Sequence, residues 1–227
     1  MSHTFFMNKL LIQSLFFIGF VLAAPTLSLC AQPKKMLSGS ASSASTLIEI
    51  IKVNPTIKLD IRYATTNNFM GKVLYPSARC YLRASVAEKL NRVQKELRSK
   101  GLGLKIFDAY RPLSVQKKLW DACPDERYVA HPKKGSKHNR GSAVDLTLID
   151  LKTEKELEMP SAFDDFTAKA HRVYSAMRSD IVRKNCRLLE DVMVKHGFVP
   201  YKYEWWHFDD SNWELYDLLD VSFDALK

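Results

Sequence analysis

The chain contains few cysteines, no block of like charges and no internal repeat, and each absence narrows what it can be. The spacing of its 4 cysteines does not indicate a metal site built from thiolates. The formal net charge is +9, yet no run of five or more like charges occurs, so a nucleic-acid-binding surface is not indicated. The positive charge is compatible with acidic wall polymers or lipid headgroups, without being specific for either.

What the chain does contain is the composition of a globular protein. Hydrophobic residues make up 46% of it and charged residues 26%. Its 227 residues are enough for one domain with a buried core and an N-terminal extension.

The first residues predict an exported protein. Lys9 precedes an almost wholly apolar run, residues 10–24, which is shorter than the ~20 residues of a membrane-spanning helix. This pattern predicts a signal peptide over residues 1–31, cleaved to leave a periplasmic chain with no stable membrane span. Lipidation of Cys30 is the alternative, although Leu29 is bulky where a lipoprotein signal has a small residue.

Three cysteines remain after such a cleavage, and an exported compartment permits a disulfide. Cys80 and Cys123 both lie in loop-like contexts, whereas Cys186 falls inside a helical pattern. We therefore expect a bond between Cys80 and Cys123, with three unpaired thiols as the open alternative.

Beyond the signal, residues 32–46 are small and polar and predict a flexible linker, and residues 47–227 form the globular domain. Apolar periodicity predicts helices over residues 84–100 and 181–196, a short helix from a Ser114 cap to Trp120, and strands over residues 102–110 and 143–148. A strand-rich segment follows over residues 198–208. These elements mix without regular alternation. The fold class is therefore α+β, with a small mixed or antiparallel sheet and flanking helices.

The stretch "GSKHNRGSAVDLTLID" brings two candidate metal ligands into one region. Its strand alternates, so that Asp145 points away from the face of Val144. His138 stands seven residues earlier, between Gly135 and Gly141, which allow the backbone to fold it back over the strand. Taken singly, His138 could be a loop histidine and Asp145 an edge-strand charge.

A third candidate ligand, His207, lies in "EWWHF", three residues after Glu204. Two imidazoles and a carboxylate are a suitable protein set for a catalytic zinc ion, which keeps one open position. Glu204 is then the candidate general base for a water that attacks a carbonyl group. Residues three apart face opposite ways in a flat strand, so we expect a bulge or kink between Glu204 and His207.

Several longer motifs carry a family resemblance: "LDIRYATTNNFMGK", "FDAYRP", "GSKHNRGSAVDLTL" and "GFVPYKYEWWHF". With them the chain resembles the zinc D-alanyl-D-alanine dipeptidases of the vancomycin-resistance type. The resemblance implies one zinc ion per chain, in a cleft on the sheet face, with Glu204 as base and Arg111 stabilising the tetrahedral intermediate. The implied zinc ligands are His138, Asp145 and His207, and the implied substrate-binding residues are Tyr63, Tyr75, Ser136 and Asp164.

The expected activity is hydrolysis of D-Ala-D-Ala to two D-alanines, in cell-wall turnover outside the cytoplasm. Asp164 is suited to pair with the free ammonium of a dipeptide, which would exclude longer chains. A carboxypeptidase or endopeptidase acting on intact peptidoglycan stem peptides is the alternative. A third interpretation is a non-catalytic wall-binding module with a structural zinc ion. The expected partner is the dipeptide or a peptidoglycan-derived peptide, with no nucleic acid.

Overall fold

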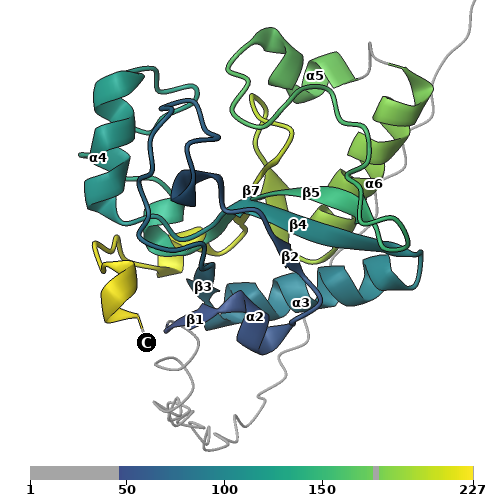
Figure 1. Ribbon diagram of the computed structural model, residues 1–227, viewed down its shortest axis with the longest axis horizontal. Coiled ribbons are helices and arrows are strands. Elements are labelled where there is room, and N and C mark those ends of the chain that lie inside the picture. The colour runs from purple at the N-terminus through teal and green to yellow at the C-terminus, as the bar shows by residue number, and fades with distance from the viewer. Residues whose placement is uncertain (1–45, 176–178, 227) are drawn as a thin grey trace, which may run out of the picture. The chain divides into compact units, whose positions relative to one another are not determined.

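A computed structural model describes residues 46–175 and 179–226, which all fall in one unit of the chain, Leu37–Lys227. The predicted signal peptide (residues 1–31) and all but the last residue of the predicted linker lie outside the described residues. No helix of the described part is long and apolar enough to cross a membrane. The architecture is α+β, as the sequence predicts (Figure 1).

The centre of the fold is a five-stranded sheet with the order β2-β4-β5-β7-β6. These strands are β2 (Lys58–Leu59), β4 (Leu102–Asp108), β5 (Ala143–Asp150), β7 (His207–Asp210) and β6 (Phe198–Pro200). Only β2 and β4 run parallel, and the other neighbours are antiparallel. A second, two-stranded sheet pairs β1 (Leu47–Glu49) with β3 (Tyr81–Arg83).

The two long amphipathic helices, α3 and α6, pack against each other and against the sheet. Figure 1 shows α3 running beneath β4. The helices are α2 (Ile50–Val53), α3 (Ala84–Arg98), α4 (Leu113–Ala122), α5 (Arg172–Ser175) and α6 (Asp180–Lys195). Their buried stripes include Leu90 and Leu189, which join the main core. Gly101 and Gly197, expected after α3 and α6, both have positive φ, a conformation that glycine adopts without strain.

The start of α4 differs from the prediction. Pro112, not Ser114, occupies the position before the helix, and the helix runs from Leu113 to Ala122. The backbone N–H of Ser114 donates to Asp220 Oδ1 at 2.8 Å. A carboxylate from the distant C-terminal segment therefore satisfies the helix N-terminus that Ser114 was expected to cap.

The predicted disulfide is wrong. Cys80, Cys123 and Cys186 are all free thiols, which was the alternative left open. Cys80 only looks loop-like in the sequence: it stands directly before β3, is 1% exposed, and accepts a backbone hydrogen bond from Ile50. Cys123 follows the end of α4 in a partly exposed position. A local sequence context does not show whether two thiols face each other.

A candidate metal centre

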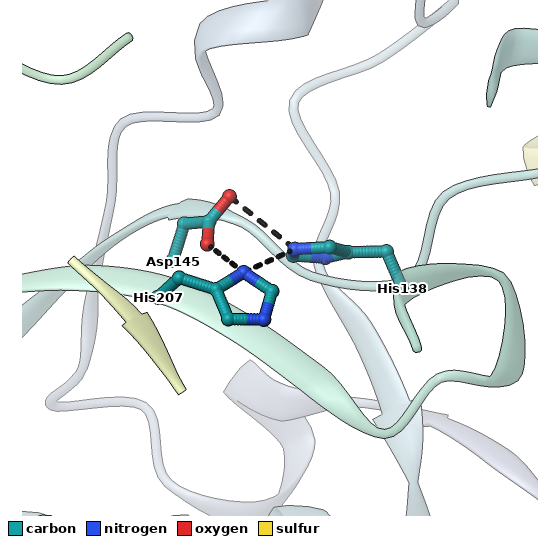
Figure 2. Close-up of side chains that lie close together, drawn as sticks. All are labelled: His138, Asp145 and His207. Atoms are coloured by element: carbon teal, nitrogen blue, oxygen red, sulfur yellow. Dashed lines mark hydrogen bonds and ion pairs between the residues drawn. The ribbon is translucent and has the colours of Figure 1, made fainter. Parts of the chain in front are cut away.

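His138, Asp145 and His207 converge at one point on the sheet (Figure 2). Asp145 on β5 and His207 at the start of β7 are directly opposite each other in the antiparallel register, which puts both side chains on the same face. His207 Nδ1 is 3.0 Å from Asp145 Oδ1, and His138 Nε2 is 3.1 Å from His207 Nδ1 and 3.4 Å from Asp145 Oδ2. Residues 62 and 69 positions apart thus form one buried cluster.

Two glycines place His138 beside the strand. His138 begins the 3₁₀ turn η2 (His138–Arg140), which ends at Gly141. Gly135 and Gly141 have φ values of +72° and +68°. A Cβ at Gly141 would lie 2.5 Å from Leu47 Cδ2, so a side chain there would also clash with the Leu47 side chain. Both glycines were expected to fold His138 back over the strand, and their backbone conformations confirm it.

The far nitrogen of each imidazole is held by an oxygen acceptor. His138 Nδ1 donates to the carbonyl oxygen of Ala109 at 2.6 Å, and His207 Nε2 donates to Asp209 Oδ1 at 2.8 Å. These hydrogen bonds occupy the far nitrogens and leave the two nitrogens that face each other as the ones that would coordinate a metal ion. Two imidazole nitrogens and a carboxylate at this spacing could hold one metal ion between them.

The separations match those of a bound ion. A tetrahedral ion with bonds of about 2.0–2.1 Å holds its ligand atoms about 3.3 Å apart. The distances here are 3.1 Å between the two nitrogens, 3.0 Å from His207 to Oδ1 of Asp145 and 3.4 Å from His138 to Oδ2. With one ligand atom from each residue, the three atoms lie within 4.8 Å of one another. The carboxylates also favour positive charge: burial lowers the pKa of His207, but Asp209 and Asp145 outweigh burial and raise it to about 10. The cluster therefore fits a small divalent ion with N and O ligands.

Glu204 lies beside this cluster. Its Oε2 is 3.6 Å from His207 Nδ1, and the side chain is buried. The expected kink is present, as a turn over residues 201–206 that precedes β7. Burial raises the pKa of Glu204 to about 8, with Asp145 and Asp164 adding to the rise and His207 opposing it. A carboxylate with a pKa in this range is suited to accept a proton near neutral pH.

Arg111 follows β4 and is held rigidly. Its Nε and Nη2 donate to Asp108 Oδ2 at 3.0 and 2.6 Å, and its Nη1 donates to Gln116 Oε1 at 2.8 Å. The guanidinium also stacks on Tyr63, with Cζ 5.1 Å from the ring centroid. A guanidinium has five N–H donors. Contacts among the described residues use three of them, and two remain for a ligand.

A cavity of about 320 Å³ adjoins the cluster. Its walls include Arg111, Glu204 and three of the four predicted substrate-binding residues, namely Tyr63, Ser136 and Asp164. Ser136 Oγ accepts the backbone N–H of His138 at 3.2 Å, so this hydroxyl also fixes the start of η2.

Asp164 is the acidic group of the cavity wall. Tyr63 donates its hydroxyl to Asp164 Oδ1 and Phe69 its backbone N–H to Oδ2, both at 3.3 Å. The backbone of Asp164 is left-handed, with φ of +62°, a strained conformation that is common at functional sites. Burial, followed by the charge of Asp145, raises the pKa of Asp164 to about 7.

Tyr75 has a different position from the other predicted substrate-binding residues. It is buried, and its hydroxyl donates to Asp108 Oδ1 at 2.7 Å. The other oxygen of Asp108 holds Arg111. The structure thus places Tyr75 behind Arg111, two hydrogen bonds from the cavity.

Two carboxylates of the site, Asp108 and Asp209, were missed at the sequence level. Asp209 follows His207 by two residues in "HFDD", and strand alternation alone puts the two on one face. Asp108 precedes Arg111 by three residues in "FDAYRP", but the irregular backbone between them hides that contact from a pattern.

Comparison with known proteins decides the family. The family model Peptidase_M15, D-ala-D-ala dipeptidase, matches residues 43–222. The chain belongs to this family. A D-alanyl-D-alanine dipeptidase of Escherichia coli (strain K12) is 35% identical over 182 residues, which are 80% of this chain and 93% of that protein. Enzymes of the same name from Enterococcus faecalis (strain ATCC 700802 / V583) and Streptomyces coelicolor (strain ATCC BAA-471 / A3(2) / M145) are 31% and 30% identical, each covering 67% of this chain and 85% of the relative.

Membership of the D-Ala-D-Ala dipeptidase family confirms the expected metallopeptidase class. The matched residues 43–222 contain every predicted site residue, from Tyr63 to His207. A metallopeptidase needs a metal beside a base and an oxyanion donor. His138, Asp145 and His207 are the candidate position for that metal, in a cavity that Glu204 and Arg111 also line.

Asp209→Asn should weaken zinc binding by about tenfold to a hundredfold, because a neutral amide orients His207 less firmly and makes it a poorer ligand. Competition with a chromogenic chelator measures the affinity. The matched control is Asp210→Asn, the next residue of β7, whose buried carboxylate pairs with Lys89. That variant should lose thermal stability but keep its zinc affinity. Equal affinity of Asp209→Asn and the wild type would contradict the role of Asp209.

Proposed function

We propose that the protein hydrolyses free D-Ala-D-Ala to two D-alanines, using one zinc ion per chain held by His138, Asp145 and His207. The observation that carries this proposal is the convergence of these ligands beside Glu204 and Arg111 in one cavity. Two imidazoles and one carboxylate in close proximity favour zinc among the divalent metals. Zinc bound there would supply Lewis-acid activation of the scissile carbonyl and of water.

Glu204 moves the proton in this reaction. Its carboxylate takes a proton from the water whose oxygen attacks the scissile carbonyl carbon. When the C–N bond breaks, Glu204 returns that proton to the leaving amine of the second D-alanine. The water is consumed, and Glu204 regains its starting state. Its burial keeps bulk water from competing for the proton.

Arg111 stabilises the negative charge that develops on the carbonyl oxygen. The two N–H donors of Arg111 that do not bind Asp108 or Gln116 can bind this oxygen in the tetrahedral intermediate. Asp108 and Gln116 hold the guanidinium in place before the substrate arrives, so little reorganisation is needed during the reaction.

Asp164 selects substrates with a free amine. Its carboxylate lies in the cavity wall, fixed by Tyr63 and Phe69, and can pair with the ammonium of a dipeptide. An acylated amine would leave this buried carboxylate without a charged partner, which penalises longer peptides.

A carboxypeptidase or endopeptidase acting on peptidoglycan stem peptides is the competing assignment, and it uses the same metal centre. Free D-Ala-D-Ala and its N-acetyl derivative separate the two. We expect at least a hundredfold higher kcat/KM for the free dipeptide, with activity lost on chelation. Equal or faster cleavage of the N-acetyl compound would favour the competing assignment and remove the role of Asp164. The placement of Glu204 in an open cavity argues against a purely structural zinc site.

The KM for the free dipeptide should depend on pH through Asp164. Because the pKa of this carboxyl is about 7, it is mostly neutral and cannot pair with an ammonium at lower pH. KM should therefore rise as pH falls, by about tenfold per unit well below pH 7. Asp164→Asn should raise KM and flatten this dependence. Measurements with zinc kept saturating test this, and an unchanged pH profile in the variant would refute it.

We also propose that the protein acts outside the cytoplasm, in the turnover of wall fragments in the periplasm. The support is the cationic residue and apolar run that predict a signal over residues 1–31. N-terminal sequencing of the protein from fractionated cells tests this. A periplasmic chain beginning near residue 32 agrees with the proposal, a lipidated Cys30 would indicate the membrane-anchored alternative, and an uncleaved cytoplasmic chain would contradict both.

A further inference from the structure

The cavity beside the metal centre contains cationic side chains that the proposed reaction does not use. Lys137 stands between Ser136 and the ligand His138, and it lines the cavity together with Trp213 and Asp209. Its Nζ is 3.3 Å from Asp209 Oδ2 and 5.1 Å from the centroid of the Trp213 ring. These contacts hold the ammonium at the cavity wall, on the side of Asp209.

Asp164 belongs to a different part of the wall. It contacts Tyr63 and Phe69, and the charges that act most strongly on it are those of Asp145, Arg111 and Asp108. Lys137 acts instead on Asp209, which binds the far nitrogen of His207. The negative Asp164 and the positive Lys137 therefore line the same cavity through separate sets of contacts.

A free dipeptide is a zwitterion that suits such a pair. With its ammonium on Asp164 and its scissile carbonyl at Arg111, its carboxylate lies one residue further on, about 3.3–3.6 Å along the chain. A carboxylate that loses part of its hydration in this cavity is stabilised by a cationic partner. That partner has to stand on the leaving-group side of the scissile bond.

Other cations of the wall are committed elsewhere. Arg111 holds Asp108 and faces the oxyanion, Arg140 donates to the Tyr216 carbonyl, and Arg127 and Lys134 form exposed pairs with Asp125 and Glu126. Among the described residues, Lys137 has one charged contact, with Asp209, at 3.3 Å. An ammonium carries three donors, so this contact leaves capacity for a substrate carboxylate.

We propose that Lys137 binds the C-terminal carboxylate of the dipeptide and restricts the enzyme to substrates with a free C-terminus. This proposal rests on the proposed dipeptidase function, and it adds recognition of the C-terminal end of the substrate to recognition of its amine. Asp164 requires a free amine and Lys137 a free carboxylate. Together they limit the substrate to one peptide bond, and Lys137 excludes cleavage within a cross-linked wall peptide.

The test compares D-Ala-D-Ala with D-alanyl-D-alanine amide, whose carboxylate is replaced by a neutral carboxamide. Wild type should prefer the acid by tenfold or more in kcat/KM. Lys137→Met should lower kcat/KM for the acid by about tenfold to a hundredfold, mainly through KM, because one charge-assisted hydrogen bond is lost. The amide should be cleaved as by wild type, and Lys137→Arg should recover part of the preference for the acid.

The control is Lys133→Met, which removes one positive charge from the same loop at an exposed position. It should leave the acid-to-amide ratio unchanged, and bound zinc is measured in every variant. If Lys137→Met lowered kcat/KM equally for the acid and the amide, Lys137 would act only through Asp209, and the proposal would be overturned. An unchanged kcat/KM for the acid would overturn it as well. A wild type that cleaves acid and amide equally overturns it while leaving the dipeptidase function intact. A zinc-loaded wild type that cleaves neither refutes that function as well.

Discussion

Glu204→Gln should reduce kcat for D-Ala-D-Ala by about 10²–10⁴-fold while the protein keeps its zinc. The glutamine amide fills nearly the same volume, so the turn before β7 and its contact with His207 should persist. It cannot accept a proton from water, however. The change therefore removes proton transfer and leaves the three metal ligands in place. Steady-state kinetics and metal analysis on the same sample measure both quantities.

The matched control for this variant is Glu214→Gln, which neutralises an exposed glutamate. Its kcat should equal that of the wild type. If Glu204→Gln retained more than about a tenth of the activity with zinc bound, Glu204 would not be the base. If the variant lost zinc as well as activity, Glu204 would be a fourth ligand and the site a closed one.

Arg111→Lys should lower kcat by about 10²–10³-fold with a smaller effect on KM. Lysine keeps a positive charge beside the buried Asp108, so the core is not left with an unpaired carboxylate. It cannot reproduce the planar fork that binds Asp108 and Gln116 while offering two donors to the cavity. The loss should therefore fall on the transition state, where the oxyanion develops.

Thermal unfolding separates this effect from misfolding. Arg111→Lys should unfold within a few degrees of wild type, whereas Arg111→Ala should be clearly less stable because the buried Asp108 then lacks its cationic partner. Arg98→Lys, at the exposed end of α3, is the control and should change neither stability nor kcat. A fully active Arg111→Lys would show that a point charge suffices and that the fork geometry is not used.

Much of the metal site could be predicted because its determinants are local. Strand alternation put Asp145 on one face, and two glycines indicated the turn that returns His138. What the sequence could not show was the register that pairs Asp145 directly with His207. Register depends on how β7 docks against β5, a contact between segments 62 residues apart.

The failures came from contacts between distant parts of the chain. Ser114 has the chemistry of a helix cap, but Asp220 fills that role from 106 residues away. Cys80 resembles a loop residue until β3 buries it in the core. Tyr75 donates its hydroxyl to the buried Asp108, a contact that no local pattern indicates, and its role in substrate binding stays a prediction. In each case the side chain has several possible partners, and tertiary packing decides between them.

A zinc titration of the metal-free protein, with D-alanine release from D-Ala-D-Ala as the readout, tests the idea that an ion completes this site. Activity should be absent without metal, rise in proportion to added zinc and level off at one equivalent per chain, while His138→Ala should stay inactive throughout. Release of D-alanine by rigorously metal-free protein, or a plateau that His138→Ala reaches equally well, would contradict the account.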